Sequence, residues 1–162
     1  MGDVIDMVHV VITYMFMFLI GLSLVVAVNE TFSDLSDNIS EEGLEQGLGK
    51  IANSVADSVY NVYILGSHSQ GSDGSVLAQF KIDLPNYLYG ERIFVNFALV
   101  DGNVEVLAFT NKTISLSVSA LLTGISVSSI DFEGELSSEL PNHYVKYIEN
   151  GSVDIIRLVS SL

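Results

Sequence analysis

An apolar segment near the N-terminus is the feature that most constrains how this chain folds. Residues 10–28 read VVITYMFMFLIGLSLVVAV, nineteen consecutive positions without a charged side chain. A helix of that length rises about 28 Å at about 1.5 Å per residue, roughly the thickness of the hydrocarbon core of a bilayer. Residues 10–28, called the apolar segment below, must therefore be covered by lipid or by protein that replaces lipid.

The charges around the apolar segment separate it from ordinary targeting signals. Asp3 and Asp6 precede it, and the first Lys or Arg in the chain is Lys50. A secretory signal peptide has a basic region before its apolar run and a small-residue cleavage site after it. A typical membrane anchor has cations at one flank. The apolar segment fits neither pattern.

Composition limits the partners and the chemistry. The chain has 162 residues and a formal net charge of −14, from 20 acidic and 6 basic residues, and it has no cysteine. The six bases are scattered singly, so the sequence predicts neither a nucleic-acid site nor a landing site for anionic lipid headgroups. The lack of cysteine excludes disulfides, thiolate catalysis and cysteine-based zinc sites.

Beyond the apolar segment, apolar residues recur mostly three and four positions apart, which predicts an amphipathic continuation of the same helix. We expect the helix to end near Ser58, because residues 59–65 (VYNVYIL) are β-branched and aromatic. The stripe consists of Phe32, Leu35, Ile39, Leu44, Leu48, Ile51, Val55 and Val62.

Three glycines, Gly43, Gly47 and Gly49, mark the weak point of this helix, because each costs roughly 1 kcal/mol relative to alanine. We interpret them as a candidate hinge. Gly43 and Gly47 also match the small-xxx-small spacing that allows close helix approach. A bend or close packing against the following domain explains them at least as well as packing between membrane helices.

After a turn at residues 66–74, the pattern changes to period two. Candidate strands are residues 76–82, 92–100, 104–111, 113–121, 126–133 and 153–159, with turns at 101–103 and 149–152. The sequence therefore predicts an α+β chain in which residues 1–58 form an N-terminal hydrophobic helix. Residues 59–162 would form an antiparallel β-sandwich or barrel-like headgroup.

No constellation of catalytic residues is evident, so we predict that the protein is not an enzyme and needs no cofactor. His9, His68 and His143 lie far apart, and none has a second ligand at metal-binding spacing. Glu133 and Glu135 fall two residues apart, which places both on a solvated strand face. Four sequons make N-linked glycosylation a prediction: Asn111 and Asn150 at expected turns, and Asn29 and Asn38 on the helix.

An N-terminal apolar helix without cations, which continues amphipathically and leads to a β headgroup, resembles the type IV pilin superfamily. Archaeal pilins and archaellins are the most similar branch. The resemblance covers the layout of the whole chain, and its sequence signal is residues 1–28, MGDVIDMVHVVITYMFMFLIGLSLVVAV. It implies a structural subunit of an extracellular archaeal filament used for adhesion, inserted in the membrane before assembly and then polymerised with copies of itself.

In that family a basic leader is removed before the apolar helix, which would explain the missing cations. Bacterial pilins usually carry Glu at the fifth mature position, where this chain has Ile5. The resemblance then implies one of two alternatives: Asp3 or Asp6 pairs with a neighbour's N-terminal amine, or the acid is dispensable, as it is in archaeal relatives. It implies a filament core built by Val4, Ile5, Met7, Val10, Val11, Ile12, Tyr14, Met15, Phe16, Phe18, Leu19, Ile20, Leu22, Leu24 and Val25.

Two alternatives stay open. The helix could span a membrane permanently and display the β domain outside, as in archaellum stator components. A membrane-tethered enzyme or solute-binding domain is a further alternative, and it would require a deep polar pocket in the β domain.

Overall fold

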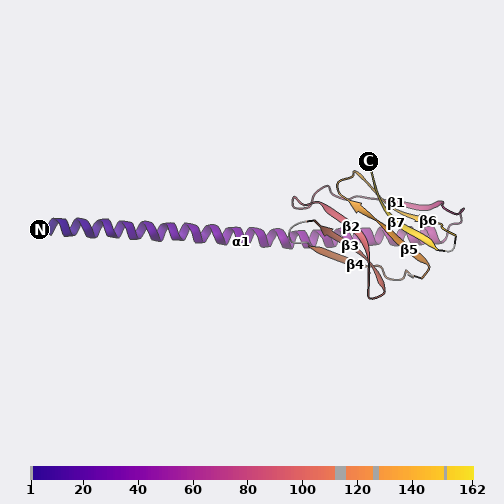
Figure 1. Ribbon diagram of the computed structural model, residues 1–162, viewed down its shortest axis with the longest axis horizontal. Helices are drawn as coiled ribbons and strands as arrows, with labels where there is room; N and C mark the ends of the chain where they lie inside the picture. The colour runs from indigo at the N-terminus through magenta and orange to yellow at the C-terminus, as the bar shows by residue number, and fades with distance from the viewer. Residues whose placement is uncertain (1, 112–115, 126–127, 152) are drawn as a thin grey trace. The chain divides into compact units, whose positions relative to one another are not determined.

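The computed structural model describes residues 2–111, 116–125, 128–151 and 153–162 (Figure 1). It contains one long helix, α1 (Gly2–Ser67), followed by a seven-stranded, mostly antiparallel sheet. The predicted α+β class, with a long N-terminal helix ahead of the strands, is confirmed. The strands are β1 (Val76–Ile82), β2 (Ile93–Val100), β3 (Asn103–Thr110), β4 (Ser117–Leu121), β5 (Ile130–Ser137), β6 (Asn142–Ile148) and β7 (Asp154–Ser161).

The chain divides into two compact units, Met1–Glu41 and Glu42–Leu162, called the stem unit and the head unit. The division lies earlier than the boundary between residues 58 and 59 that the sequence analysis placed at the expected end of the helix. The reason is that α1 contributes core residues from Leu44 to Val62, so this part of the helix belongs to the head unit.

The prediction that the helix ends near Ser58 is wrong, because α1 continues to Ser67. Val59 and Val62 are fully buried and extend the apolar stripe of the helix into the core of the head unit. Their burial stabilises the helix by about 1.5–3 kcal/mol for each side chain. The preference of residues 59–65 for strand is weaker, because helix propensities differ by at most about 0.7 kcal/mol for ordinary residues.

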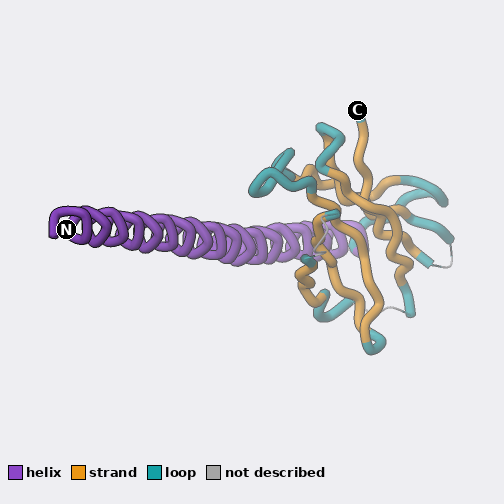
Figure 2. Tube along the Cα trace, turned by 60° about the vertical axis from the view of Figure 1, so that its left-hand side comes forward, coloured by secondary structure: helices purple, strands orange, loops and turns teal. Residues whose placement is uncertain are grey.

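Within the head unit, α1 runs across one face of the sheet (Figures 1 and 2). The strand order is β1-β6-β7-β5-β2-β3-β4, and every neighbouring pair is antiparallel except β5 with β7. The layer that packs on this sheet is therefore a helix, where the sandwich prediction placed a second sheet. Its contribution to the core is Leu44, Leu48, Ala52, Val55, Val59 and Val62.

The strands follow the period-two rule that predicted them. In β3, Val104, Val106 and Ala108 are buried, whereas the residues between them are half-buried. The expected turn after β2 is confirmed: Asp101 and Gly102 have φ of 51° and 80°, the left-handed values of a two-residue hairpin.

Three strands, β4, β5 and β6, differ most from the prediction. β5 occupies Ile130–Ser137 rather than residues 126–133, and β6 was missed altogether. The inward positions of β6 are His143, Val145 and Tyr147, so two of its three core side chains are polar and weaken the hydrophobic alternation. Of the predicted strand 113–121, only Ser117–Leu121 is strand, and residues 112–115 and 126–127 lie outside the described residues.

Gly134 is the point at which β5 changes partner. Residues 130–134 pair in parallel with β7, and residues 135–137 pair antiparallel with β2. Gly134 has a φ of 91°, and a Cβ placed there would lie 2.1 Å from the carbonyl oxygen of Leu158. Only glycine fits this position without strain, so it joins the two halves of the sheet.

Candidate assembly surface

The apolar side chains of the stem unit that the structure describes are exposed. Those of the apolar segment that the structure describes and that were assigned to a filament core are 44–71% exposed: Val11, Ile12, Tyr14, Met15, Phe16, Phe18, Leu19, Ile20, Leu22, Leu24 and Val25. The side chains of Asp3, Val4, Ile5, Asp6, Met7 and Val10 lie outside the described residues.

This exposure extends around the whole circumference of the helix. Seven consecutive side chains, from Tyr14 to Ile20, are exposed, and seven residues cover about two helical turns. The helix is long and apolar enough to cross a membrane by length and composition, and none of its most apolar window is buried within the chain. An apolar surface on all sides needs an environment that surrounds it, since a partner on one face would leave the rest in water.

The amphipathic part of the stem unit also lacks a cover within its own unit. Phe32, Leu35 and Ile39 are 67%, 53% and 60% exposed, whereas Leu44 and Leu48 in the head unit are buried. The predicted stripe is thus covered by the sheet in its second half only. The first half adds to the surface available to other molecules.

Gly43 and Gly47 lie under the turn that precedes β2. A Cβ at Gly47 would lie 2.6 Å from Leu88 Cδ2, and one at Gly43 would lie 2.5 Å from Tyr89 Oη. Leu88 and Glu91 exchange two backbone hydrogen bonds of 2.9 Å, which closes this turn. Because these two glycines have no side chain, the turn can pack directly against α1. The helix is unbroken through Gly43, Gly47 and Gly49, and a hinge there stays a prediction.

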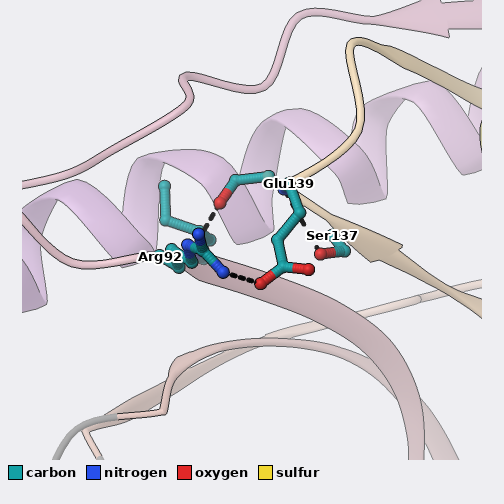
Figure 3. A network of polar contacts seen from close by, with 5 residues as sticks. Arg92, Ser137 and Glu139 are labelled. Atoms are coloured by element: carbon teal, nitrogen blue, oxygen red, sulfur yellow. Dashed lines mark hydrogen bonds and ion pairs between the residues drawn. The ribbon is translucent and has the colours of Figure 1, made fainter. Parts of the chain in front are cut away.

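A polar cluster lies beside this turn, where Arg92 donates a hydrogen bond to the carboxylate of Glu139 (Figure 3). Tyr87 and Glu139 raise the pKa of Arg92, through a side-chain hydrogen bond and through charge. The carboxylate of Glu139 accepts the hydrogen bond from the Arg92 guanidinium. The backbone N–H of Glu139 donates a hydrogen bond to Ser137 Oγ at 3.3 Å. The charges of Arg92 and Glu139 are therefore engaged with each other.

The three histidines do not form a metal site. His9 and His68 are exposed, whereas His143 is buried on β6 with Nδ1 3.1 Å from Ser160 Oγ. Among the described residues, no group of three or more His, Cys, Asp or Glu side chains is arranged to hold a metal ion.

Glu133 and Glu135 are both exposed, as expected. Glu133 forms an ion pair with Arg157 on the neighbouring strand β7, which the sequence did not predict. This pair ties together the two parallel strands at the surface. It leaves no acid and base facing each other across a substrate site.

All four sequon asparagines, Asn29, Asn38, Asn111 and Asn150, are exposed. Asn150 begins the turn between β6 and β7, where Val153 N donates to Asn150 O at 3.2 Å, so the expected turn is confirmed. Residues 112–115 and 152, which complete two of the sequons, lie outside the described residues. Exposure permits modification at all four asparagines.

One half-buried polar contact of the head unit was not predicted from the sequence. Tyr147 Oη donates to Asp154 Oδ2 at 2.6 Å, and burial followed by this hydrogen bond raises the pKa of Tyr147. Tyr147 lies on β6, the strand that was not predicted, and its partner lies on β7. Sequence spacing alone carries no signal for this pair, because the contact depends on strand register.

A comparison with models of known protein families finds no match, and comparisons with curated proteins and with solved structures find none either.

Proposed function

We propose that the chain is a structural subunit of an extracellular filament of the archaeal type IV pilus kind. The apolar segments of many copies would pack together in the core, and the head units would face outward. The observation that carries the proposal is the exposure of apolar side chains on every side of the stem helix. A bundle of several neighbouring helices covers such a surface completely.

The energy of this exposure explains why the stem helix needs partners. Burying one large apolar side chain is worth about 1.5–3 kcal/mol, so an isolated helix with more than ten of them exposed would aggregate in water. The bilayer covers the helix before assembly. In a helical array each copy contacts the next through two different patches, and because such a contact does not close on itself it generates a fibre.

The outer surface of such a filament would be acidic and rich in hydroxyl and amide groups, consistent with the net charge of −14. Such a surface suits adhesion or surface contact. Glycans on the exposed sequon asparagines would extend this surface further from the core.

A permanently membrane-anchored protein is the competing function, because one helix that is long enough to cross a membrane fits it as well. The two functions differ in where the protein is found. A filament subunit is released when cells are sheared, whereas an anchored protein stays in the membrane fraction.

The experiment is negative-stain microscopy of sheared cell-surface material, combined with mass spectrometry of its protein. We expect filaments that contain this chain, with an N-terminus that lies ahead of Asp3 and Asp6. Recovery of the chain only from membranes, with no filaments in the sheared material, would overturn the proposal in favour of the anchored protein.

A further inference from the structure

Lys50 is the only Lys or Arg in the 66 residues of α1, a helix that carries nine Asp and Glu residues. It lies in the head unit and is exposed. Its neighbours on the helix surface, three and four positions away, are Gln46, Gly47, Asn53 and Ser54, and none of them is acidic. Within the described part of the chain no hydrogen bond or ion pair satisfies the Lys50 ammonium.

The stem unit presents the opposite charge. Residues 30–41, called the acidic segment, contain Glu30, Asp34, Asp37 and Glu41 and no base. The side chains of Glu30, Asp34 and Glu41 are exposed. On the same segment Phe32, Leu35 and Ile39 are at least 53% exposed, so it combines apolar surface with uncompensated negative charge.

Two identical helices packed in parallel without an offset would place each acid of the acidic segment beside the same acid of the neighbour. Like charges at close range repel, and desolvation between helices strengthens the repulsion. An axial offset removes this conflict if it brings a cation to the acids. Lys50 is the one cation on the helix that an offset can supply.

Resting on the proposed function, we propose that the helix face around Lys50 docks the acidic segment of a second copy of this chain. Lys50 would lie beside residues 9 to 20 positions earlier in the neighbour, an offset of about 14–30 Å along the helix. Charge complementarity between Lys50 and these acids sets the offset.

This pairing is heterologous, because Lys50 of one copy meets the acids of another and its own acids remain available for a third. It therefore propagates along a fibre instead of closing a dimer. The same charges disfavour copies that pack without an offset, because their acids would then lie beside each other.

The absence of cysteine from the chain allows a direct test by disulfide cross-linking. Ser54 lies one turn from Lys50, while Ser33, Ser36 and Ser40 lie along the acidic segment, and all but Ser54 belong to the stem unit. One full-length chain carries Ser54→Cys and a second, differently tagged chain carries Ser33→Cys, Ser36→Cys or Ser40→Cys. The two are co-expressed, oxidised in membranes and in sheared material, and scored for mixed disulfides.

We expect a mixed disulfide with at least one of the three acidic-segment positions. Lys50→Gln should lower its yield by up to about fivefold, the effect of one exposed ion pair. Lys50→Glu should lower the yield of the mixed disulfide further. Raising the salt concentration to 1 M should lower the yield as Lys50→Gln does, because the Debye length falls to about 3 Å and the charges are screened. Lys81→Glu, the same charge change on β1 of the head unit, is the matched control and should leave the yield unchanged.

Charge reversal gives a second, independent measurement. In the Lys50→Glu chain, one of Glu30→Lys, Asp34→Lys or Glu41→Lys should restore the mixed disulfide, and the position that does so reports the offset. Lys50 is exposed and has no ion-pair partner among the described residues, so circular dichroism and the Tm of Lys50→Glu in detergent should match the unsubstituted protein.

The outcomes separate this pairing from the filament itself. Mixed disulfides that depend on Lys50, found in membranes without any filament, would support the pairing and overturn the filament. Filaments that form without mixed disulfides, or mixed disulfides indifferent to Lys50→Glu, would overturn the pairing and leave the filament standing. If neither filaments nor mixed disulfides are found, both the pairing and the filament are overturned.

Discussion

The ring of Tyr147 lies directly over Gly66, so close that a Cβ at position 66 would be 2.2 Å from Tyr147 Cγ and 2.8 Å from Tyr147 Cβ. These are the atoms nearest the backbone of β6 and cannot swing away as the end of a flexible side chain can. The contact fixes the last turn of α1 on the sheet. It also explains why the helix reaches Ser67, since glycine at position 66 permits an approach that any other residue would block.

Gly66→Ala should therefore destabilise the head unit by about 1–3 kcal/mol, the usual cost of overpacking a core. Gly49→Ala is the matched control, because its Cβ would meet only Val118 Cγ1 at an ordinary 3.6 Å. That substitution should stabilise the helix by up to about 1 kcal/mol, the helix propensity of alanine over glycine. Chemical unfolding of the full chain in detergent measures both, and equal effects of the same sign would contradict the packing argument.

The end of α1 shows where sequence reasoning reaches its limit. The stripe from Leu44 to Val55 was predictable, because helical period is a local property that survives in sequence. That Val59 and Val62 belong to the helix was not predictable from propensity, because the sheet that buries them comes from later in the chain.

The surface of the stem unit was the most predictable part of the candidate site, since its apolar character follows from composition alone. The contact between Gly47 and Leu88 could be predicted only as close packing against the following domain, because Leu88 lies far from Gly47 in the sequence. The lone position of Lys50 on α1 was readable from the sequence. Its lack of a partner needed the structure.

Replacing Tyr147 with phenylalanine removes the hydroxyl that donates a hydrogen bond to Asp154, so the half-buried Asp154 carboxylate loses this hydrogen bond. We expect Tyr147→Phe to lower the free energy of unfolding by about 1.5–3 kcal/mol, as for a hydrogen bond to a charged group. Tyr144→Phe, on the half-buried face of the same strand, is the control and should change it little.

Tyr147 also predicts behaviour in alkali. Its pKa is raised in the folded protein, so the unfolded chain loses this proton first as the pH rises. The stabilisation is complete below about pH 10, the ordinary tyrosine value, and is lost above it. Unfolding measured between pH 8 and 11 should show a steeper loss for the unsubstituted protein than for Tyr147→Phe, and parallel curves would refute the assignment.

Acid should weaken the head unit through His143. Burial lowers the pKa of His143, with Asp83 opposing this shift and Lys81 adding to it. The unfolded chain therefore binds the proton more readily, and stability is lost as the pH falls below the ordinary histidine value of about 6.5. We expect the Tm to fall from pH 7 to pH 5, and to fall less in His143→Gln. A Tm that is flat over this range in the unsubstituted protein would count against the buried, neutral histidine.

Arginine in the apolar segment should separate membrane insertion from assembly. The segment contains twelve Val, Ile, Leu and Phe residues, and at about −0.3 to −0.6 kcal/mol each they favour insertion by about 4–7 kcal/mol. One arginine near the centre costs about 2.5–3.5 kcal/mol, so Phe18→Arg should still insert. The double substitution of Phe18→Arg with Leu22→Arg should not, and the chain should become extractable by alkaline carbonate.

Filament assembly should respond to the single substitution. In a core of identical helices, Phe18→Arg buries an unpaired charge in every copy. The arginine of a lone helix in a membrane can reach water or lipid headgroups, whereas an arginine inside the helix bundle cannot. Tyr60→Arg, at another exposed position of α1, in the head unit, is the control for charge and should neither release the chain nor prevent filaments. If Phe18→Arg cells still shed filaments of normal length and number, the apolar segment does not form the filament core, and its environment is lipid alone.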